Sequence, residues 1–140
     1  AAPLIIDGLR MIASGRFSLT EQDEAKVTMA PKLTKTDGAI DWGRDALKVR
    51  DQIRGLAGWP GSYSRFKGKL IKIFPPVSAD QEAAKASPGT VIAVSKSALR
   101  VACGSGHLEI TDLQPEGKRR MSVREFEAGH GIKEGDKFLH

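Results

Sequence analysis

The hydrophobic period of this sequence changes at Gly61, and the change restricts the fold more than any other feature. Before it, over residues 41–56, apolar residues such as Val49 and Ile53 recur three or four positions apart, as on one face of an amphipathic helix. After it, apolar and polar residues alternate in short runs separated by turn residues, which is typical of strands. One helix followed by about five short strands predicts a mostly β chain with flanking helices, in which a small antiparallel sheet closes as a barrel. An OB-like barrel is the first expectation among such folds.

The expected strands lie at residues 63–66, 69–74, 90–94, 98–103 and 107–113. Lys67-Gly68 is a two-residue hairpin turn, and the register it implies pairs Phe66 with Lys69 and Tyr63 with Lys72. Alternation then gives this hairpin an apolar face and a wetter face, and the wetter face carries Tyr63 and Lys72. The small, proline-bounded segment at residues 75–89 is predicted to be a loop.

Three helices are predicted, at residues 3–14, 41–56 and 122–128. Asp41 is the expected N-cap of the second helix, because an aspartate side chain accepts hydrogen bonds from the free amides at a helix start. Ser122 and Glu125 occupy the two positions of a capping box at the third. The first helix has an apolar face but no helical partner in the residues that follow, so it is predicted to belong to a larger unit. Between the first two helices, residues 28–33 are expected to form at most a short extended segment, which Pro31 would limit to the edge of a sheet.

The composition fits one soluble domain with a short appendage. Of the 140 residues, 40% are hydrophobic and 28% are charged, and no apolar run approaches the roughly 18 residues that span a bilayer. The N-terminal residues lack the positive start of a signal peptide. The single cysteine, Cys103, excludes an internal disulfide and suits a reducing compartment, so a cytoplasmic protein with no membrane partner is expected.

The sequence carries no catalytic motif of a common kind. It contains no HExxH, no paired CxxC, no Walker A loop and no GxSxG elbow. The scattered histidines, His107, His130 and His140, are expected to be ordinary surface residues. Cys103 lies in an apolar strand without a neighbouring histidine and is expected to be a buried, inert thiol. No catalytic residue, metal site or bound cofactor is therefore predicted in this chain.

Basic residues are clustered along the chain. The formal net charge is +5, but from Arg44 to Lys72 eight basic residues stand against two acidic ones, a local balance of +6. From Lys118 to Arg124 there are four basic residues and no acidic one. Clustered cations favour a polyanionic partner, because neutralising phosphates with release of counterions needs several cations together. Nucleic acid is the expected partner.

Three stretches of sequence together carry a resemblance to a known family. They are VTMAPKLTKTDGAIDW, IRGLAGWPGSY and LQPEGKRRMS. The chain resembles the C-terminal portion of the methionyl-tRNA formyltransferase family over nearly its whole length, from the helix at residues 3–14 to about residue 139. The resemblance implies a parent enzyme that transfers a formyl group from formyl-tetrahydrofolate, its co-substrate, to the methionine amino group of initiator tRNA. The family's catalytic Asn, His and Asp belong to an N-terminal domain, and no position here matches them.

The resemblance also implies a division of the chain. Residues 1–15 are expected to be the last helix of a missing catalytic domain, residues 16–40 an interdomain linker, and residues 41–140 an OB-like C-terminal domain that binds tRNA and is inactive alone. Without the rest of that catalytic domain, residues 1–15 are expected to self-associate with a second copy, to pack on the barrel, or to fray. Trp42 is expected to be a packing residue, and Trp59-Pro60 a structural turn, with base stacking as the alternative.

The candidate nucleic-acid-binding residues are all cations. They are Lys118, Arg119 and Arg120 on a loop, Arg50, Arg54, Arg65 and Lys72 in a second group, and Lys32 and Lys35 in the linker. Their expected contacts are with the phosphate backbone of initiator methionyl-tRNA, which would position the RNA without reading its sequence. For each group, a solvated surface with no partner is the alternative.

Two other functions stay open. One is the C-terminal domain of a related formyltransferase or of a formyl-tetrahydrofolate hydrolase, with no nucleic-acid role. The other is a free-standing OB module for single strands, although aromatic residues are only 6% of the sequence and such modules use them for stacking.

Overall fold

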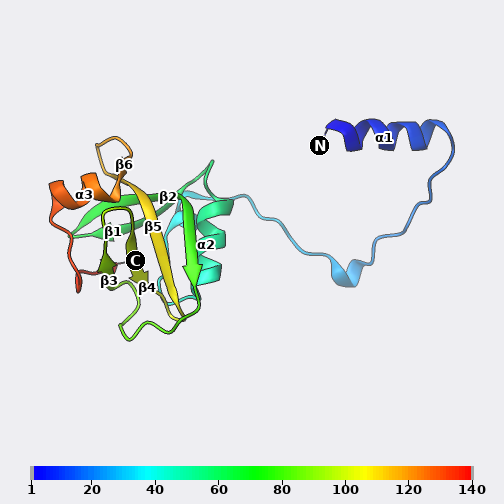
Figure 1. Cartoon of the computed structure of the whole chain (residues 1–140). Helices are drawn as coiled ribbons and strands as arrows, with labels where there is room; N and C mark the ends of the chain where they lie inside the picture. The colour runs from blue at the N-terminus through cyan, green and yellow to red at the C-terminus, as the bar shows by residue number, and fades with distance from the viewer. Residues whose placement is uncertain (1, 140) are drawn as a thin grey trace. The chain divides into compact units, whose positions relative to one another are not determined.

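The computed structural model describes residues 2–139 and divides into two units, Ala1–Pro31 and Lys32–His140 (Figure 1). The first unit contains α1 (Ala2–Ala13) and a short 3-10 helix, η1 (Glu24–Lys26). α1 confirms the helix expected near the start of the chain. Gly15 ends it with φ of 67°, a left-handed conformation that glycine adopts without strain.

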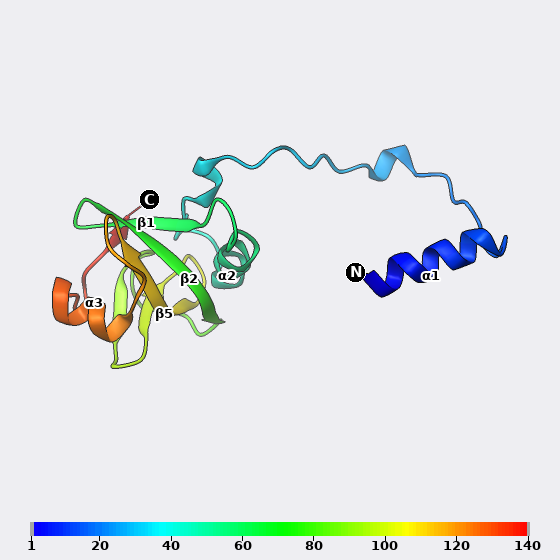
Figure 2. The same ribbon diagram turned by 90° about the horizontal axis from the view of Figure 1, so that it is seen from above.

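The second unit is built on one sheet with a helix at either end. Its helices are η2 (Lys35–Gly38), α2 (Ala46–Gly55) and α3 (Val123–His130). Its strands are β1 (Ser62–Phe66), β2 (Lys69–Asp80), β3 (Val91–Val94), β4 (Leu99–Ala102), β5 (His107–Pro115), β6 (Met121–Ser122) and β7 (Phe138–Leu139). The strand order is β3-β4-β5-β2-β1-β7, with β6 paired to β5. α2 and α3 lie at opposite ends of this unit in both views (Figures 1 and 2).

The sheet curls until its two ends meet. The outermost strands in the order are β3 and β7, yet the bridge Thr90↔Lys137 joins the segments beside them, and the Phe138 amide donates to the Gly89 carbonyl at 2.8 Å. All the strand pairs of the sheet are antiparallel. The predicted small OB-like antiparallel barrel is therefore confirmed.

The barrel is filled by apolar side chains from the sheet and from both helices. Phe66 contacts Phe126 of α3 and Phe138 of β7, with ring centroids 5.8 Å and 5.2 Å apart. Trp42 packs on Phe138 at 5.8 Å and donates through its indole N–H to Ser64 Oγ at 2.9 Å. Trp42 is 4% exposed, which confirms it as a packing residue. Burying the ring is favourable because its one polar group keeps a partner.

The first hairpin follows the prediction closely. The register pairs Tyr63 with Lys72 and Phe66 with Lys69 across Lys67-Gly68, as expected. Ser64, Phe66, Ile71 and Ile73 face the core, whereas Tyr63, Arg65, Leu70 and Lys72 face outward. At the other end of the sequence, Ser122 and Glu125 form the expected capping box on α3.

Several element boundaries differ from the predictions. The N-cap of α2 is Asp45, whose side chain accepts from the Leu47 amide at 2.8 Å, and the earlier Asp41 instead accepts from the Gly43 amide in a turn. Residues 28–33 form no strand. β2 continues past residue 74 to Asp80, because a register shift between Phe74 and Val77 accommodates two prolines that cannot donate to the ladder.

Candidate nucleic-acid interface

The outward face of the β1–β2 hairpin brings cations and aromatic rings together. Lys72 is paired with Tyr63 on one side and with Gln114 of β5 on the other. Residues paired across antiparallel strands project from the same face, so these three side chains form a row. Arg65 and Leu70 form the next row, and the backbone of Glu116 continues it through its bond to the Leu70 carbonyl.

A hollow of about 420 Å³ opens on this face, and we call it the Trp59 hollow. It is lined by Lys35, Trp59, Pro60, Tyr63, Leu70 and Lys72. Two of the lining residues are lysines and none is acidic. Trp59 is 54% exposed, unlike the buried Trp42.

Lys35 reaches the hollow because the segment that carries it is fixed to the barrel. The Ile40 amide donates to the Tyr63 carbonyl at 2.9 Å. Gln52 of α2 donates through Nε2 to the carbonyls of Asp37 and Ala39, each at 3.0 Å. These bonds hold η2, and with it the backbone of Lys35, against β1.

The turn that carries Lys35 is also held by hydrogen bonds between its own residues. The Asp37 carboxylate accepts from the Thr34 amide at 2.6 Å and from the Thr34 hydroxyl at 2.8 Å. These two hydrogen bonds favour the charged form and hold the pKa of Asp37 below its ordinary value. The carboxylate thus bonds within its own turn, and no ion pair joins it to Lys35.

Lys118 borders the same face at the β5–β6 loop. Gln114, which shares a row with Lys72, donates through Nε2 to the Lys118 carbonyl at 2.8 Å. A smaller hollow of about 260 Å³ is lined by Leu70, Lys72, Gln114, Pro115, Glu116 and Gly117. Since Leu70 and Lys72 line both hollows, the outward face is continuous from η2 to this loop.

The two arginines beside Lys118 are already engaged. Arg119 forms an ion pair with Glu125 at 2.5 Å. Arg120 pairs with Asp112 at 3.1 Å, donates to the Pro75 carbonyl at 2.9 Å and stacks over the Phe74 ring with its guanidinium carbon 4.8 Å from the centroid. Both arginines are therefore held on the protein, and part of their charge is compensated.

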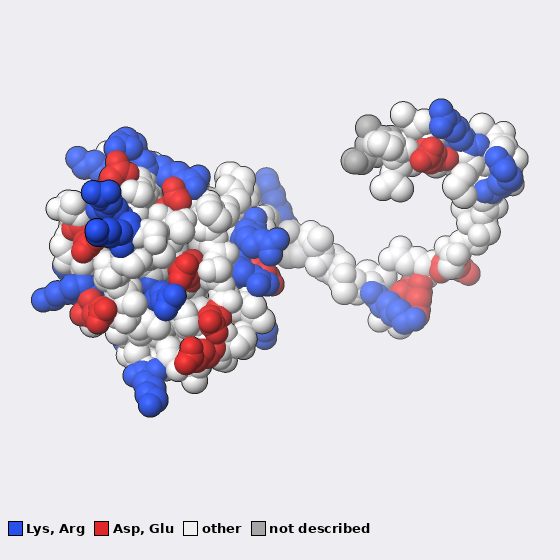
Figure 3. Space-filling model, viewed as in Figure 1, with Lys and Arg blue, Asp and Glu red and all other residues white. Residues whose placement is uncertain are grey.

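The predicted binding residues fall into two classes when sorted by ion pairing. The first class consists of residues that form an ion pair with a carboxylate. Arg50 and Arg54 both pair with Asp51, at 2.8 Å and 3.7 Å, and so join Arg119 and Arg120 in this class. Within residues 2–139, no carboxylate pairs with the other five, which are Lys32, Lys35, Arg65, Lys72 and Lys118. The structure gathers Lys35, Arg65, Lys72 and Lys118 around the outward face, while Arg50 and Arg54 lie on α2. In Figure 3 basic side chains occur both at the end of the barrel that carries α3 and β6 and at the end that carries α2.

The structure confirms that Trp59-Pro60 lies in a turn and that Tyr63 lies on the wetter face. The sequence interpretation did not place the Trp59 ring beside Lys35 and Lys72. Alternation predicts only the strand residues of the outward row, Tyr63 and Lys72, because Trp59 lies in a turn before β1 begins. Lys35 could not be joined to this row from sequence, because the docking of η2 depends on contacts with Gln52, Gly61 and Tyr63.

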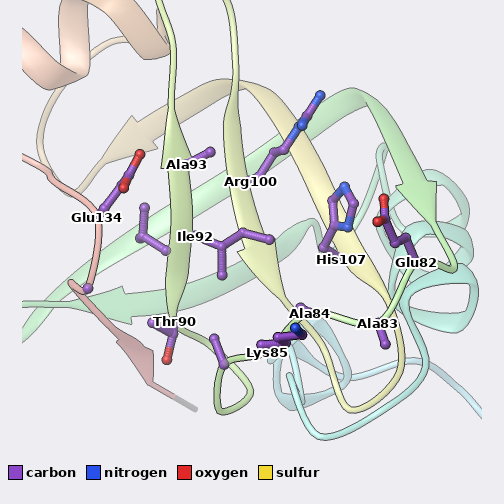
Figure 4. Close-up of a pocket in the computed structure, with 13 residues that line it drawn as sticks. Glu82, Ala83, Ala84, Lys85, Thr90, Ile92, Ala93, Arg100, His107 and Glu134 are labelled. Atoms are coloured by element: carbon purple, nitrogen blue, oxygen red, sulfur yellow. The ribbon is translucent and has the colours of Figure 1, made fainter.

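A third hollow, of about 560 Å³, lies across β3, β4 and β5, and Figure 4 shows its lining. It mixes Glu82 and Glu134 with Lys85 and Arg100, and Arg100 is paired with Glu109 at 3.0 Å. His107 also lines it and is only 9% exposed, so the expectation of a surface histidine is wrong. His107 is enclosed because its strand is paired on both sides, with β2 and with β4. The mixed charge gives this hollow no preference for an anion.

The described residues show no catalytic constellation. Cys103 is 4% exposed, and burial, with a smaller effect from the Asp45 charge, raises the pKa of its thiol to about 12. The predicted inert thiol is thus confirmed. No group of three histidine, cysteine or acidic side chains in residues 2–139 is placed to hold a metal ion. None of the described helices has the length and apolar character needed to cross a membrane.

The family model for the formyl transferase C-terminal domain matches residues 32–131. The chain belongs to this family. Among curated relatives, the methionyl-tRNA formyltransferase of Citrifermentans bemidjiense is 39% identical over 134 residues, which cover 96% of this chain and 41% of that protein. The methionyl-tRNA formyltransferase of Geotalea daltonii is 37% identical over 139 residues, covering 99% and 44%. The predicted resemblance is confirmed, and this formyl transferase C-terminal domain spans less than half the length of either relative.

Solved structures support the fold of the formyl transferase C-terminal domain. A multiply substituted variant of HypX from Aquifex aeolicus matches with a TM-score of 0.63 and 23% identity over 93% of this chain and 23% of HypX. HypX in complex with tetrahydrofolic acid matches with a TM-score of 0.61 and 24% identity over the same shares. At this identity the likeness extends to the fold alone.

Proposed function

We propose that this chain is the tRNA-binding C-terminal region of a methionyl-tRNA formyltransferase, a translation-initiation enzyme of the cytoplasm. The observation that carries the proposal is the outward face with Lys35, Arg65, Lys72 and Lys118, none of which has a carboxylate partner among the described residues. The curated relatives' names supply the substrate. The whole enzyme would transfer a formyl group from formyl-tetrahydrofolate to the methionine amino group of initiator tRNA.

In this proposal the unpaired lysines neutralise phosphates of the tRNA backbone. Lysine ammonium groups act on phosphate as point charges, and exposed unpaired ones lose little on binding because no intramolecular ion pair is broken. The engaged arginines, Arg119 and Arg120, would contribute less, since Glu125 and Asp112 compete for them. Such contacts hold and orient an RNA without specifying its sequence.

The division of the chain remains part of the proposal. Residues 1–15 would belong to a catalytic domain, residues 16–40 to the linker and residues 41–140 to the barrel domain. Formyl transfer and binding of formyl-tetrahydrofolate are assigned to that catalytic domain, so we expect this chain alone to give no formylation above background.

The alternative is a related formyltransferase or formyl-tetrahydrofolate hydrolase whose C-terminal domain has no nucleic-acid role. The likeness to HypX, which is one of fold, is compatible with either function. The two functions differ in the role of the outward face. In the proposed function its cations bind phosphates, and in the alternative they stay solvated.

A salt titration separates the two functions. Labelled initiator methionyl-tRNA is titrated with the chain at several salt concentrations, and the dissociation constant is followed by anisotropy. The proposal predicts that the logarithm of the association constant falls linearly with the logarithm of the salt concentration. The slope should be about 0.7–0.9 for each phosphate contacted. Absence of binding at the lowest salt would favour the alternative.

A further inference from the structure

Trp59 is exposed at a position where the fold makes little use of its ring. It leaves 54% of its surface in water, and in the described part of the chain it makes no ring-to-ring contact, whereas Trp42, Phe66, Phe126 and Phe138 are linked by such contacts. Leaving a large aromatic side chain in water is unfavourable, because burying it contributes more free energy than burying most other side chains. An exposed ring of this size inside a hollow therefore points to a binding role.

The chemistry of the Trp59 hollow selects one kind of ligand. Pro60, Tyr63 and Leu70 give it apolar walls beside the indole, and Lys35 and Lys72 give it two positive charges. A cationic ligand would find no carboxylate among the lining residues. A purely apolar ligand would cover two lysines without pairing them, which is unfavourable. A flat aromatic group that carries negative charge satisfies both parts of the lining.

The hollow is formed before any ligand binds. Lys72 is fixed by its pairing with Tyr63 and Gln114, and the backbone of Lys35 by the bonds of η2 to Tyr63 and Gln52. Its volume of about 420 Å³ falls in the range of about 300–1,000 Å³ typical of small-molecule sites. Binding would thus cost the freedom of the ligand, of the two lysine side chains and of the exposed Trp59 ring, but not that of the backbone.

We propose that the Trp59 hollow holds one unpaired nucleotide of an RNA, with the base stacked on Trp59 and the adjoining phosphates on Lys35 and Lys72. The base must be unpaired because a base inside a duplex has both faces covered by its neighbours. This inference rests on the proposed function, since it assigns a particular contact to the RNA that the outward face binds. Such a contact would make the chain prefer RNA with an accessible loop base over a fully paired helix.

The test uses fluorescence, because the chain has two tryptophans and only Trp59 is exposed. The full chain is titrated with a short oligouridylate, with an abasic oligomer of equal length and charge, and with a blunt RNA duplex. We expect quenching by the oligouridylate alone and its loss in Trp59→Phe, where the remaining indole is buried. Trp59→Ala should weaken oligouridylate binding about 5- to 150-fold, the range for one base stacked on an aromatic side chain. Trp59→Phe should recover most of that affinity.

Phe17→Ala is the matched control, since Phe17 is 50% exposed and lies in the other unit. It should leave the affinity unchanged. Equal quenching by the abasic oligomer would overturn the stacking inference, and so would a Trp59→Ala variant that keeps wild-type affinity. In either case binding of initiator tRNA by the same protein leaves the proposed function standing. If neither tRNA nor oligouridylate binds, the proposed function fails and the inference with it.

Discussion

Gly38 lies so close to Gly61 that a β-carbon on Gly38 would overlap the Gly61 carbonyl oxygen. This contact lets η2 dock on the start of β1, and it is the reason that a turn-rich, basic stretch leads directly into Ile40 and Trp42. The docked turn presents Lys35 to the Trp59 hollow. One backbone contact therefore links the stability of the η2 segment to the composition of the outward face.

Gly38→Ala should separate η2 from β1. The added methyl group has no space, so we expect a loss of about 1–3 kcal/mol in the free energy of unfolding, as for other overpacked sites. Binding of RNA should weaken as well, because Lys35 moves with the turn. Urea unfolding measures the first effect. Gly55→Ala, at the end of α2 with no atom near the added methyl group, is the control and should be neutral or stabilising. A Gly38→Ala protein as stable as the wild type would contradict the docking.

The capping of α3 should make stability depend on pH. The Ser122 amide, the Arg119 guanidinium and the Ser122 hydroxyl all donate to Glu125, and they lower its pKa below the ordinary value of 4.5. A carboxyl group whose pKa is lowered on folding stabilises the protein above its unfolded pKa and loses that contribution as pH falls through the folded pKa. The stability difference between wild type and Glu125→Gln should therefore be present at neutral pH and shrink under acid. Unfolding curves at both conditions check this, and a difference that does not change with pH contradicts it.

Cys103 should resist thiol reagents in the folded protein. Its pKa of about 12 leaves almost no thiolate at neutral pH, and the sulfur is buried. Because Cys103 is the only cysteine, modification by a chromogenic disulfide reports on this site alone. We expect the native rate to lie far below the rate in urea and to rise as the protein is destabilised. A native rate equal to that of the unfolded chain would show that the thiol is accessible.

The apolar face of α1 should drive association. Leu4, Ile5, Leu9 and Ile12 are 78%, 62%, 61% and 60% exposed. Covering each large apolar side chain is worth about 1.5–3 kcal/mol. We expect a second copy of the chain to cover this face in the absence of another partner. Solution scattering of the chain with and without residues 1–15 measures the molecular mass. Identical monomers in both samples would contradict association through this face.

Local patterns predicted the parts of the fold that depend on neighbouring residues. The Lys67-Gly68 turn fixed the register of the first hairpin, and Ser122 with Glu125 placed the start of α3. The N-cap of α2 was predicted at the wrong aspartate. Asp41 was expected, but only the Asp45 side chain meets a helical amide. The continuation of β2 beyond its two prolines depends on β5, which is distant in sequence.

The candidate site was predicted only as a set of cations. Charge counting supplied the nine candidate residues but could not show that Asp112 engages Arg120, because that contact spans two separate elements. The Trp59 hollow was missed for the same reason, since three elements contribute its lining. The sequence therefore supplied the set of candidate cations, and tertiary contacts distinguish those that are paired with carboxylates from those that are not.

The most direct test of the account is the binding of tRNA by a Lys35→Ala/Lys72→Ala double variant. Lys85→Ala/Lys96→Ala is the matched control, because it removes the same charge from exposed positions outside the Trp59 hollow. Initiator and elongator tRNA are titrated with each protein over a range of salt concentrations. We predict that the Lys35/Lys72 variant binds both tRNAs more weakly by similar factors, with a salt slope smaller by about 1.4–1.8, the contribution of two phosphates. The control should bind like the wild type. Equal affinities and slopes for the two double variants would show that the outward face does not bind tRNA.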